Sequence, residues 1–366
     1  MFSTIIKANF YDMKKATKYI IGVMSGTSLD GIDIAYVKIN KTTNYAFEIL
    51  NATTIAYSIE WKSALKEGFH LSGEELTKLD ADYGVFLGKT IQKFIKENSI
   101  KSVDFIASHG HTIYHSPAKN YTLQIGNGPY ITSITGIKSI CDFRTQDVAL
   151  GGQGAPLVPI GDLLLFSEYD YCLNLGGFSN ISMNENNQRI AYDICPVNIV
   201  LNHYATSLNL EYDDKGAIAA SGTVDLTLLN ELNSLPFYNA IKPKSLGYEF
   251  IVETIFPLIN KYNLDIKDIL RTFVEHVAMQ ITRKVDSNPS KNILVAGGGA
   301  YNTFLIERMQ WYTKTKLIIP NDTIINYKEA LVFALLGFLK DEGKNNCLKS
   351  VTGASKDHSS GVVYEF

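Results

Sequence analysis

The feature that most constrains the fold is a pattern that the chain runs through twice. In its first copy, residues 18–25 form a short apolar segment that ends in small residues, and the segments 32–39 and 45–58 follow after turns. Short apolar runs bounded by turn residues are typical of buried strands. The pattern therefore predicts three successive strands, and the turn between the first two contains glycine.

A helix is expected after the third strand. Ser72 and Glu75 have the spacing of a capping box, in which each side chain bonds the other residue's backbone at a helix start. Six large apolar residues then recur on one helical stripe: Leu76, Leu79, Tyr83, Leu87, Ile91 and Phe94. Such a stripe is typical of a helix that packs one face against a core.

The second copy begins near residue 169. It reads as the strands YDYCLNL, ISM and RIAYDI, separated by the turns GGFSN and NENNQ, with a helix from about Val197 to Leu208. Further helices, alternating with the strands NILVA and KLIIP, are expected near 248–261, 265–285, 302–313 and 328–340. This order predicts two α/β halves with mixed sheets, helices on the sheet faces and a cleft between the halves.

Length and composition narrow the class of protein. A chain of 366 residues suits two domains, and the stretch 151–162, rich in Gly and Pro, reads either as a hinge near 145–165 or as a surface loop. The chain has 34 Lys and Arg against 37 Asp and Glu, a net charge that excludes nonspecific electrostatic binding to nucleic acid or acidic lipid. The four cysteines form no CxxC pair, which disfavours a disulfide scaffold or zinc ribbon. No apolar run approaches the ~18 residues of a membrane span, so we expect a cytoplasmic protein.

Three glycine-containing turns directly follow apolar strands, at residues 25–31, 176–177 and 297–299. Backbone without Cβ lets amide groups approach an anion closely. Each turn alone can be a tight β-turn without a ligand, but three of them, two at equivalent places in the repeat, favour a nucleoside triphosphate site. Neither a Walker A motif nor a dinucleotide GxGxxG motif is present, so a site of the P-loop or Rossmann kind is not expected.

The segment GVMSGTSLDGID (22–33) resembles the opening signature of the anhydro-N-acetylmuramic acid kinases. The resemblance continues to the C-terminus through SHGHT, LQIGNGPYI, DFRTQDVALGGQGAPLVP, NLGGFSNIS, YDICPVN, KSLGYEF, VAGGGAYN, EALVFALLG and VTGAS. It implies the α/β fold of sugar kinases, actin and heat-shock chaperone ATPases, with two ribonuclease-H-like domains around a central cleft. The first domain is expected over 19–147, completed by about 350–366, and the second over 148–349. Residues 1–18 are treated as an N-terminal extension of unknown role.

The resemblance also implies an ATP site that uses Mg²⁺. Its first phosphate loop comprises Gly26, Thr27, Ser28, Leu29, Asp30, Gly31, Ile32 and Asp33. Gly176 and Gly177 are expected near the second phosphate turn, and Gly297, Gly298 and Gly299 near the adenosine. Asp30 and Asp33 are expected to hold Mg²⁺ through water, since this ion usually binds one or two carboxylates plus phosphates. A plain turn-forming role for Asp30 stays open.

In the family, water opens the internal ether of a 1,6-anhydro sugar, and the released O6 takes the γ-phosphoryl group of ATP. Asp193 in YDICPVN matches the family's catalytic aspartate, which would remove the proton of the water as a general base. Judged without the family, an Asp between a strand and a helix is more often a helix cap.

Three further residues are assigned to the substrate by the resemblance or by their chemistry: Arg144, Glu329 and His111. The planar fork of Arg144 suits sugar hydroxyls, a carboxylate or phosphate, or else a buried ion pair with Asp142 or Asp147. Glu329, expected to open the last long helix, would contact the substrate or compensate the helix dipole.

His109 and His111, with His115 nearby, carry three open interpretations. On one strand, His109 and His111 would face the same side, which can suit a metal. Hydrogen bonding to the substrate or between domains, and plain packing, are the alternatives.

Some positions depart from the common family pattern. They are Asn127 and Asn202, where Asp is frequent, Tyr248, where a basic residue is usual, and Ile194, Cys195 and Val197, where smaller residues are seen. These departures bear on Mg²⁺ coordination and sugar contacts. The predicted partners are ATP, an anhydro-amino sugar and water, without nucleic acid or membrane, and a homodimer is an open option. A kinase of another small sugar and a non-catalytic actin-like nucleotide-binding module remain alternative functions.

Overall fold

The chain divides into two compact units in the computed structural model, which describes residues 17–26, 29–41, 44–240, 242 and 244–366. Unit 1 contains the chain through Leu165 together with Glu329–Phe366, and unit 2 contains Phe166–Lys328. These division points differ from the 147/148 and 349/350 boundaries expected from the sequence. The reason lies in packing. Gly161, in the segment that ends at Leu165, packs against Val332, in the segment that begins at Glu329, so both segments belong to unit 1.

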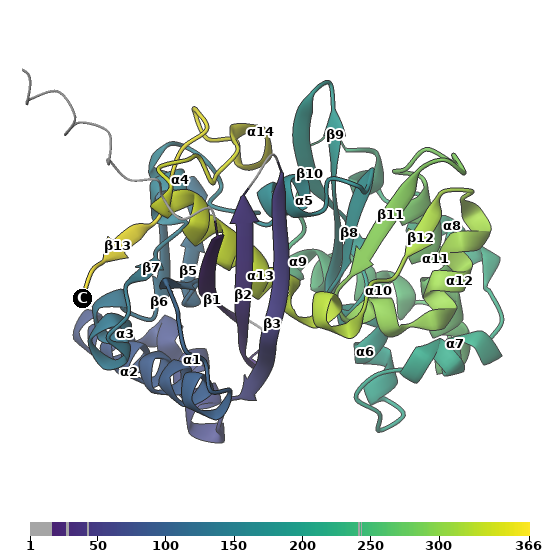
Figure 1. The fold of residues 1–366 in the computed structure, drawn as a ribbon. Coiled ribbons are helices and arrows are strands. Elements are labelled where there is room, and N and C mark those ends of the chain that lie inside the picture. The colour runs from purple at the N-terminus through teal and green to yellow at the C-terminus, as the bar shows by residue number, and fades with distance from the viewer. Residues whose placement is uncertain (1–16, 27–28, 42–43, 241, 243) are drawn as a thin grey trace, which may run out of the picture. The chain divides into compact units, whose positions relative to one another are not determined.

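Unit 1 is built on a six-stranded sheet of order β13-β7-β4-β1-β2-β3. Its strands are β1 (Thr17–Ser25), β2 (Gly31–Lys41), β3 (Tyr45–Ala56), β4 (Phe105–Ser108), β7 (Ser139–Cys141) and β13 (Val362–Tyr364). β1 and β3 each pair antiparallel with β2, which lies between them, and β4 and β7 continue the sheet parallel to β1. Figure 1 shows β1, β2 and β3 side by side in purple.

The predicted capping-box helix is α2 (Gly73–Glu97), and both bonds of the box between Ser72 and Glu75 are present. Its apolar stripe packs into the core of unit 1, as predicted. Further helices of this unit were not predicted from the sequence: α1 (Ile59–Glu67), α3 (Gly128–Thr135), α4 (Thr145–Ala149), α5 (Pro159–Leu165) and α14 (Lys349–Thr352). A separate hairpin consists of β5 (His111–Ser116) and β6 (Tyr121–Ile125).

Unit 2 has a five-stranded sheet of order β10-β9-β8-β11-β12. The strands are β8 (Tyr171–Leu175), β9 (Phe178–Glu185), β10 (Gln188–Pro196), β11 (Asn292–Ala296) and β12 (Lys316–Ile318). The first three are antiparallel, and β11 and β12 follow in parallel to β8. Both units thus place their third, second, first, fourth and fifth strands in the same order, which is the ribonuclease-H-like arrangement. The architectural repeat predicted from the sequence is confirmed.

The helices of unit 2 surround this sheet and its core. They are α6 (Asn198–Thr206), α7 (Ala217–Ser221), α8 (Leu226–Asn233), α9 (Tyr248–Phe250), α10 (Phe256–Ile259), α11 (Ile266–Thr282) and α12 (Thr303–Tyr312). The helix predicted over 248–261 contains a π-helical stretch at Ile251–Ile255 between α9 and α10. No helix in the described part of the chain combines the length and hydropathy that a membrane crossing requires.

The last long helix, α13 (Asp322–Asp341), begins six residues before the predicted start at 328. Asn321 accounts for the difference, since its side-chain Oδ1 accepts a hydrogen bond from the Ile324 N–H at 3.0 Å. This is the bond of an N-cap residue. The second division point between the units falls within this helix.

Candidate active site

Two of the predicted glycine turns lie together at one edge of the unit 2 sheet. β8 and β11 are parallel neighbours with Ala296 opposite Asn174, so the turns that follow these strands meet. A Cβ on Gly299 would lie 2.7 Å from the Leu175 Cβ. Gly297 has φ +81° and a Cβ there would lie 2.5 Å from Asn174 Oδ1, so this position requires glycine.

The start of helix α6 is fixed on the same turns. Val197 N–H donates to Gly177 O at 2.8 Å, and Asn198 N–H donates to Gly176 O at 3.3 Å. The Asn198 side-chain amide also donates to Leu175 O at 3.3 Å. A strand end, a glycine turn and a helix start are therefore held in one arrangement.

A pocket of about 880 Å³ opens beside these turns, within unit 2. It is lined by α6, by residues 212–215, by the turn from Gly298 to Thr303, and by residues 319–325 at the start of α13. The volume lies in the range of small-molecule sites. Gly298 and Gly299, assigned to the adenosine by resemblance, line the pocket, and so does Asn202, one of the departures from the family pattern.

Asp193 lies on β10 at a β-bulge between Asp193 and Cys195. Bulges of this kind re-aim a side chain and are frequent next to active sites. The Asp193 N–H donates to Lys244 O at 3.0 Å, and its Oδ2 accepts from the Leu246 N–H at 2.8 Å. No other described residue donates to its carboxylate, so Oδ1 remains available.

Burial raises the pKa of the Asp193 carboxyl, and the Leu246 N–H offsets part of this rise. The helix-cap interpretation of Asp193 is wrong. α6 begins at Asn198 with Val197 as its N-cap residue and without a side-chain cap bond. The sequence analysis did not anticipate the contact to Leu246, because KSLGYEF carried no signal of its position beyond the resemblance.

The turn predicted as the first phosphate loop connects β1 and β2 in unit 1. Thr27 and Ser28 lie outside the described residues. Leu29 has φ +61°, and its N–H donates to Gly26 O at 3.5 Å. Ile32 is fully buried in the core of unit 1.

Asp30 and Asp33, the predicted Mg²⁺ residues, differ in their surroundings. Asp30 is exposed, whereas Asp33 is half-buried and its Oδ1 accepts from Thr54 Oγ1 at 2.6 Å. Burial raises the pKa of Asp33, and the negative charge of Asp30 adds to the rise. A nearby divalent cation would relieve this repulsion, so the donor set fits Mg²⁺.

His111 belongs to a buried hydroxyl chain at the end of β1. Its Nδ1 lies 2.9 Å from Ser25 Oγ, which lies 2.6 Å from the Tyr57 hydroxyl, and Tyr57 reaches the Tyr83 hydroxyl at 2.5 Å. Burial lowers the pKa of His111 to about 4, so the ring is neutral near neutral pH. Tyr57 and Tyr83 were not singled out from the sequence as parts of a site, whereas Ser25 opens the predicted turn at 25–31.

His109 and His111 do not share a strand, so the alternation expected for them is wrong. β4 ends at Ser108, β5 begins at His111, and Gly110 between them has φ +73°. His109 Nδ1 donates to Gly110 O, and its Nε2 accepts from Arg144 Nε, both at 2.9 Å. His115 contacts neither of these histidines through its Nδ1, which lies 3.1 Å from Thr122 Oγ1.

Arg144 is held by neutral groups. Besides the bond to His109, its Nη1 donates to Gly154 O at 2.6 Å. Within the described chain, no carboxylate lies within ion-pair distance of Arg144, so the predicted pair with Asp142 or Asp147 is not formed. Burial lowers the pKa of Arg144, and the negative charge of Glu329 opposes this, which brings two predicted substrate residues into electrostatic reach.

Glu329 does not open the last helix. α13 begins at Asp322, so Glu329 lies about two turns inside it, and its side chain is exposed. Because dipole effects fade within the first turn, dipole compensation is not its role.

Two further departures from the family pattern are Asn127 in unit 1 and Tyr248 in unit 2. Asn127 precedes α3. Burial raises the pKa of the Asp80 carboxyl of α2, and the Asn127 side chain helps to lower it. Tyr248 is exposed at the start of α9.

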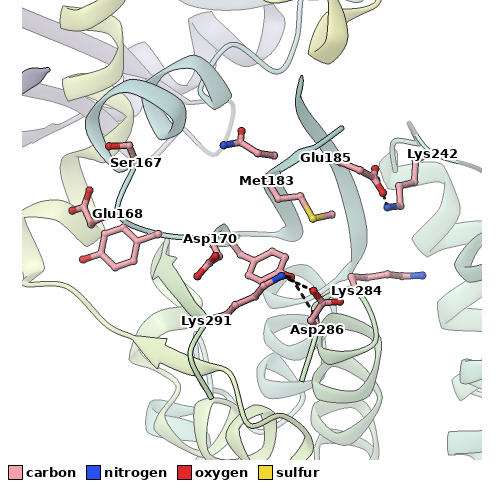
Figure 2. A pocket seen from close by; sticks show the side chains of 12 residues that line it. Ser167, Glu168, Asp170, Met183, Glu185, Lys242, Lys284, Asp286 and Lys291 are labelled. Atoms are coloured by element: carbon pink, nitrogen blue, oxygen red, sulfur yellow. Dashed lines mark hydrogen bonds and ion pairs between the residues drawn. The ribbon is translucent and has the colours of Figure 1, made fainter. Parts of the chain in front are cut away.

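A second pocket of unit 2, of about 430 Å³, contains none of the predicted site residues. It lies at the opposite ends of the strands, where β8 and β11 begin, and is lined by charged residues that include Asp170, Lys284 and Lys291. Figure 2 shows Lys291 paired with Asp286 on its wall.

Two ribonuclease-H-like sheets, one of them with glycine turns beside a ligand-sized pocket within unit 2, define a protein of the sugar-kinase and actin-like ATPase class. The family model "Anhydro-N-acetylmuramic acid kinase" matches residues 18–366, and the chain belongs to this family.

Relatives named anhydro-N-acetylmuramic acid kinase match along nearly their whole length. The relative from Sulfurimonas denitrificans is 32% identical over 371 residues, with 95% of this chain and 100% of that protein covered. Those from Mannheimia succiniciproducens and Aliivibrio fischeri are 34% and 35% identical, each with 95% of this chain and 99% of the relative covered. Among solved structures, the activator of the 2-hydroxyisocaproyl-CoA dehydratase from Clostridium difficile is similar at a TM-score of 0.43 and 14% identity, covering 88% of this chain and 95% of that one.

Proposed function

We propose that this protein converts 1,6-anhydro-N-acetylmuramic acid, water and ATP into N-acetylmuramic acid 6-phosphate and ADP. The observation that carries the proposal is Asp193, a half-buried carboxylate re-aimed by a bulge, with a raised pKa and one free oxygen. A general base needs this combination of a fixed position and a pKa closer to neutrality.

In this reaction Asp193 Oδ1 accepts a proton from the attacking water. The water oxygen bonds to the anomeric carbon, and the bond between that carbon and O6 breaks. O6 then bonds to the γ-phosphorus, ADP leaves, and the proton on Asp193 passes to solvent. Leu246 holds Oδ2, which keeps the carboxylate in one orientation throughout.

The adenosine is proposed to occupy the pocket beside Gly298 and Gly299, with phosphates near Gly176 and Gly177. The turn from Gly26 to Asp33 contributes a further phosphate loop. Asp30 and Asp33 would hold Mg²⁺ through water, and this ion would neutralise charge on the transferred phosphoryl group. Phosphoryl transfer depends mainly on such positioning and charge neutralisation.

The sugar is proposed to contact Arg144, Glu329 and His111. Arg144 donates a hydrogen bond from Nε to His109 and another from Nη1 to Gly154 O. No described residue accepts from its Nη2. This nitrogen can donate to the carboxylate or a hydroxyl of the sugar. A cytoplasmic location and a role in cell-wall recycling follow from the family and stay predictions.

The test supplies the protein and Mg-ATP with either the 1,6-anhydro sugar or reducing N-acetylmuramic acid. The expected product from the anhydro sugar has gained one water and one phosphoryl group by mass, and the reducing sugar reacts poorly. Equal or faster phosphorylation of the reducing sugar would instead support a kinase of another small sugar. ATP binding without any phosphosugar would support the non-catalytic module.

A further inference from the structure

Unit 1 contains a buried cluster of three metal-ligating side chains outside the proposed active site. Asp147, Cys347 and His358 each offer one donor atom, and the three atoms lie within 4.8 Å of one another. Their exposed fractions are 0%, 2% and 4%. Asp147 lies in α4, whereas Cys347 and His358 pair as an antiparallel bridge in the C-terminal segment.

The imidazole of His358 is the most informative member. Its Nδ1 lies 3.2 Å from the carbonyl oxygen of Lys356, which can only accept, so Nδ1 carries a proton. In the neutral ring Nε2 then holds a lone pair. Nε2 is buried without a hydrogen-bond partner and lies 3.5 Å from Asp147 Oδ1, which is also an acceptor. Two facing acceptors require a proton or a cation between them.

Asp147 is oriented as a ligand by its own hydrogen bonds. Its Oδ2 accepts from the Gly154 N–H at 2.7 Å, and its Oδ1 accepts from Thr352 Oγ1 at 2.7 Å. Such outer partners commonly fix ligating carboxylates, just as the carbonyl of Lys356 fixes the ring of His358. Oδ1 therefore faces His358 in a set geometry.

We propose that Asp147, Cys347 and His358 form a binding site for a divalent transition-metal ion of the zinc type. The sulfur, nitrogen and oxygen donors together favour Zn²⁺ over Mg²⁺, which prefers oxygen alone. Three protein ligands leave a fourth tetrahedral position for water. The site is separate from the Mg²⁺ expected with ATP.

Charge balance supports a divalent ion. On binding, the thiol proton is released to solvent and a sulfur–metal bond forms. One carboxylate and one thiolate then neutralise the two charges of the ion.

The ion would tie the C-terminal segment to α4. Arg144 is the N-cap residue of this helix, and the loop that Asp147 holds contains Gly154, the acceptor of the Arg144 Nη1 bond. A bound metal would therefore restrain the backbone around Arg144 by joining the C-terminal segment to α4. The alternative is an ion pair between protonated His358 and Asp147, with Cys347 as a bystander.

Cobalt substitution tests the site directly in the untagged full-length protein. After treatment with a chelator, the wild type is titrated with Co²⁺. We expect the intense visible bands of tetrahedral coordination and a thiolate charge-transfer band, both saturating at one equivalent. A spectrum of aqueous octahedral Co²⁺ throughout the titration would overturn the proposal.

Zinc affinity of variants, measured by competition with a chromophoric chelator, gives the second readout. Cys347→Ser and His358→Gln are expected to lose at least about 100-fold in affinity, since even outer-shell changes cost 10–100-fold. Cys141→Ser is the matched control, because Cys141 is a buried free thiol of the same unit outside the cluster. Zinc should raise the melting temperature of the wild type and the control only. Equal zinc responses in Cys347→Ser and the wild type, or no response in either, would support the ion pair instead.

Discussion

Units 1 and 2 carry the same strand order, but they use the ends of their first strands differently. In unit 2, the turns after β8 and β11 pack on each other and leave a pocket of about 880 Å³ beside them. In unit 1, Ser25 at the end of β1 is joined to Tyr57, Tyr83 and His111 by a buried chain of hydrogen bonds. The same sheet edge thus provides room for a ligand in one unit and a fixed polar cluster in the other. The difference shows why function has to be argued from the site rather than from the fold.

The largest expected effect comes from Asp193→Asn in unit 2. Turnover should fall by about 10²- to 10⁴-fold, the usual worth of a general base. Stability should not fall, because Asn can still accept from Leu246 and burial disfavours the charged form of Asp193. Steady-state kinetics and a thermal melt measure the two effects.

Asp170→Asn is the matched control, since Asp170 Oδ2 also accepts one backbone N–H, from Asn292 at 3.0 Å, but lies at the opposite strand ends. Its turnover should stay near that of the wild type. Similar turnover in the two variants would remove Asp193 from the role of base.

Two glycine-to-alanine substitutions, one in each unit, compare how closely neighbouring atoms pack against the glycine. Gly297→Ala should destabilise unit 2 by roughly 3 kcal/mol, from left-handed strain plus overlap with Asn174 and Leu175, and should weaken ATP binding. Gly151→Ala in unit 1 has φ +82° but no atom within 4 Å of the new Cβ, so only about 1–2 kcal/mol of strain is expected. Denaturant unfolding and ATP titration check both values, and equal costs would contradict the close packing of the two turns.

Acid stability depends on a buried histidine in each unit. His276 of unit 2 lies between Asn233 and the Tyr238 hydroxyl, and burial lowers its pKa to about 3, against about 4 for His111 of unit 1. Both native rings bind fewer protons than the unfolded chain, whose pKa is about 6.5. Stability is therefore complete above that pH and declines as the pH falls toward these values. In His276→Gln, the unfolding free energy should depend less steeply on pH over this range than in the wild type. An unchanged pH dependence would contradict the low pKa of His276.

The smallest expected effect is that of Arg144→Lys. Lysine cannot keep both the His109 and Gly154 bonds while offering a planar fork, so KM for the sugar should rise about 10-fold. ATP affinity should not change, because the pocket proposed for adenosine is in unit 2. A loss of ATP affinity without a change in KM for the sugar would contradict the assignment of Arg144 to the sugar and would place it in the ATP site instead.

The sequence predicted those features that depend on local pattern and strand direction. The capping box at Ser72 and the two strand triplets follow from residue spacing and from periodicity. Features set by a single backbone angle or a single cap were missed. Gly110 breaks the strand between the histidines, and Asn321 starts α13 early, which changes the setting of Glu329.

Contacts between distant segments were also beyond prediction. The bond from Leu246 to Asp193 joins residues 53 positions apart, and the Thr352 bond to Asp147 spans 205 positions. No periodicity encodes such pairs, because they depend on how loops close over the sheet. The metal-ligating cluster of Asp147, Cys347 and His358 became visible only in three dimensions.

The most direct test of the central claim follows the oxygen atom of water. The protein is incubated with Mg-ATP and the anhydro sugar in water enriched in the heavy oxygen isotope, and the product is analysed by mass spectrometry. The account predicts one heavy oxygen at the anomeric hydroxyl and none in the phosphate on O6. Heavy oxygen in released phosphate, with the sugar ether intact, would contradict it.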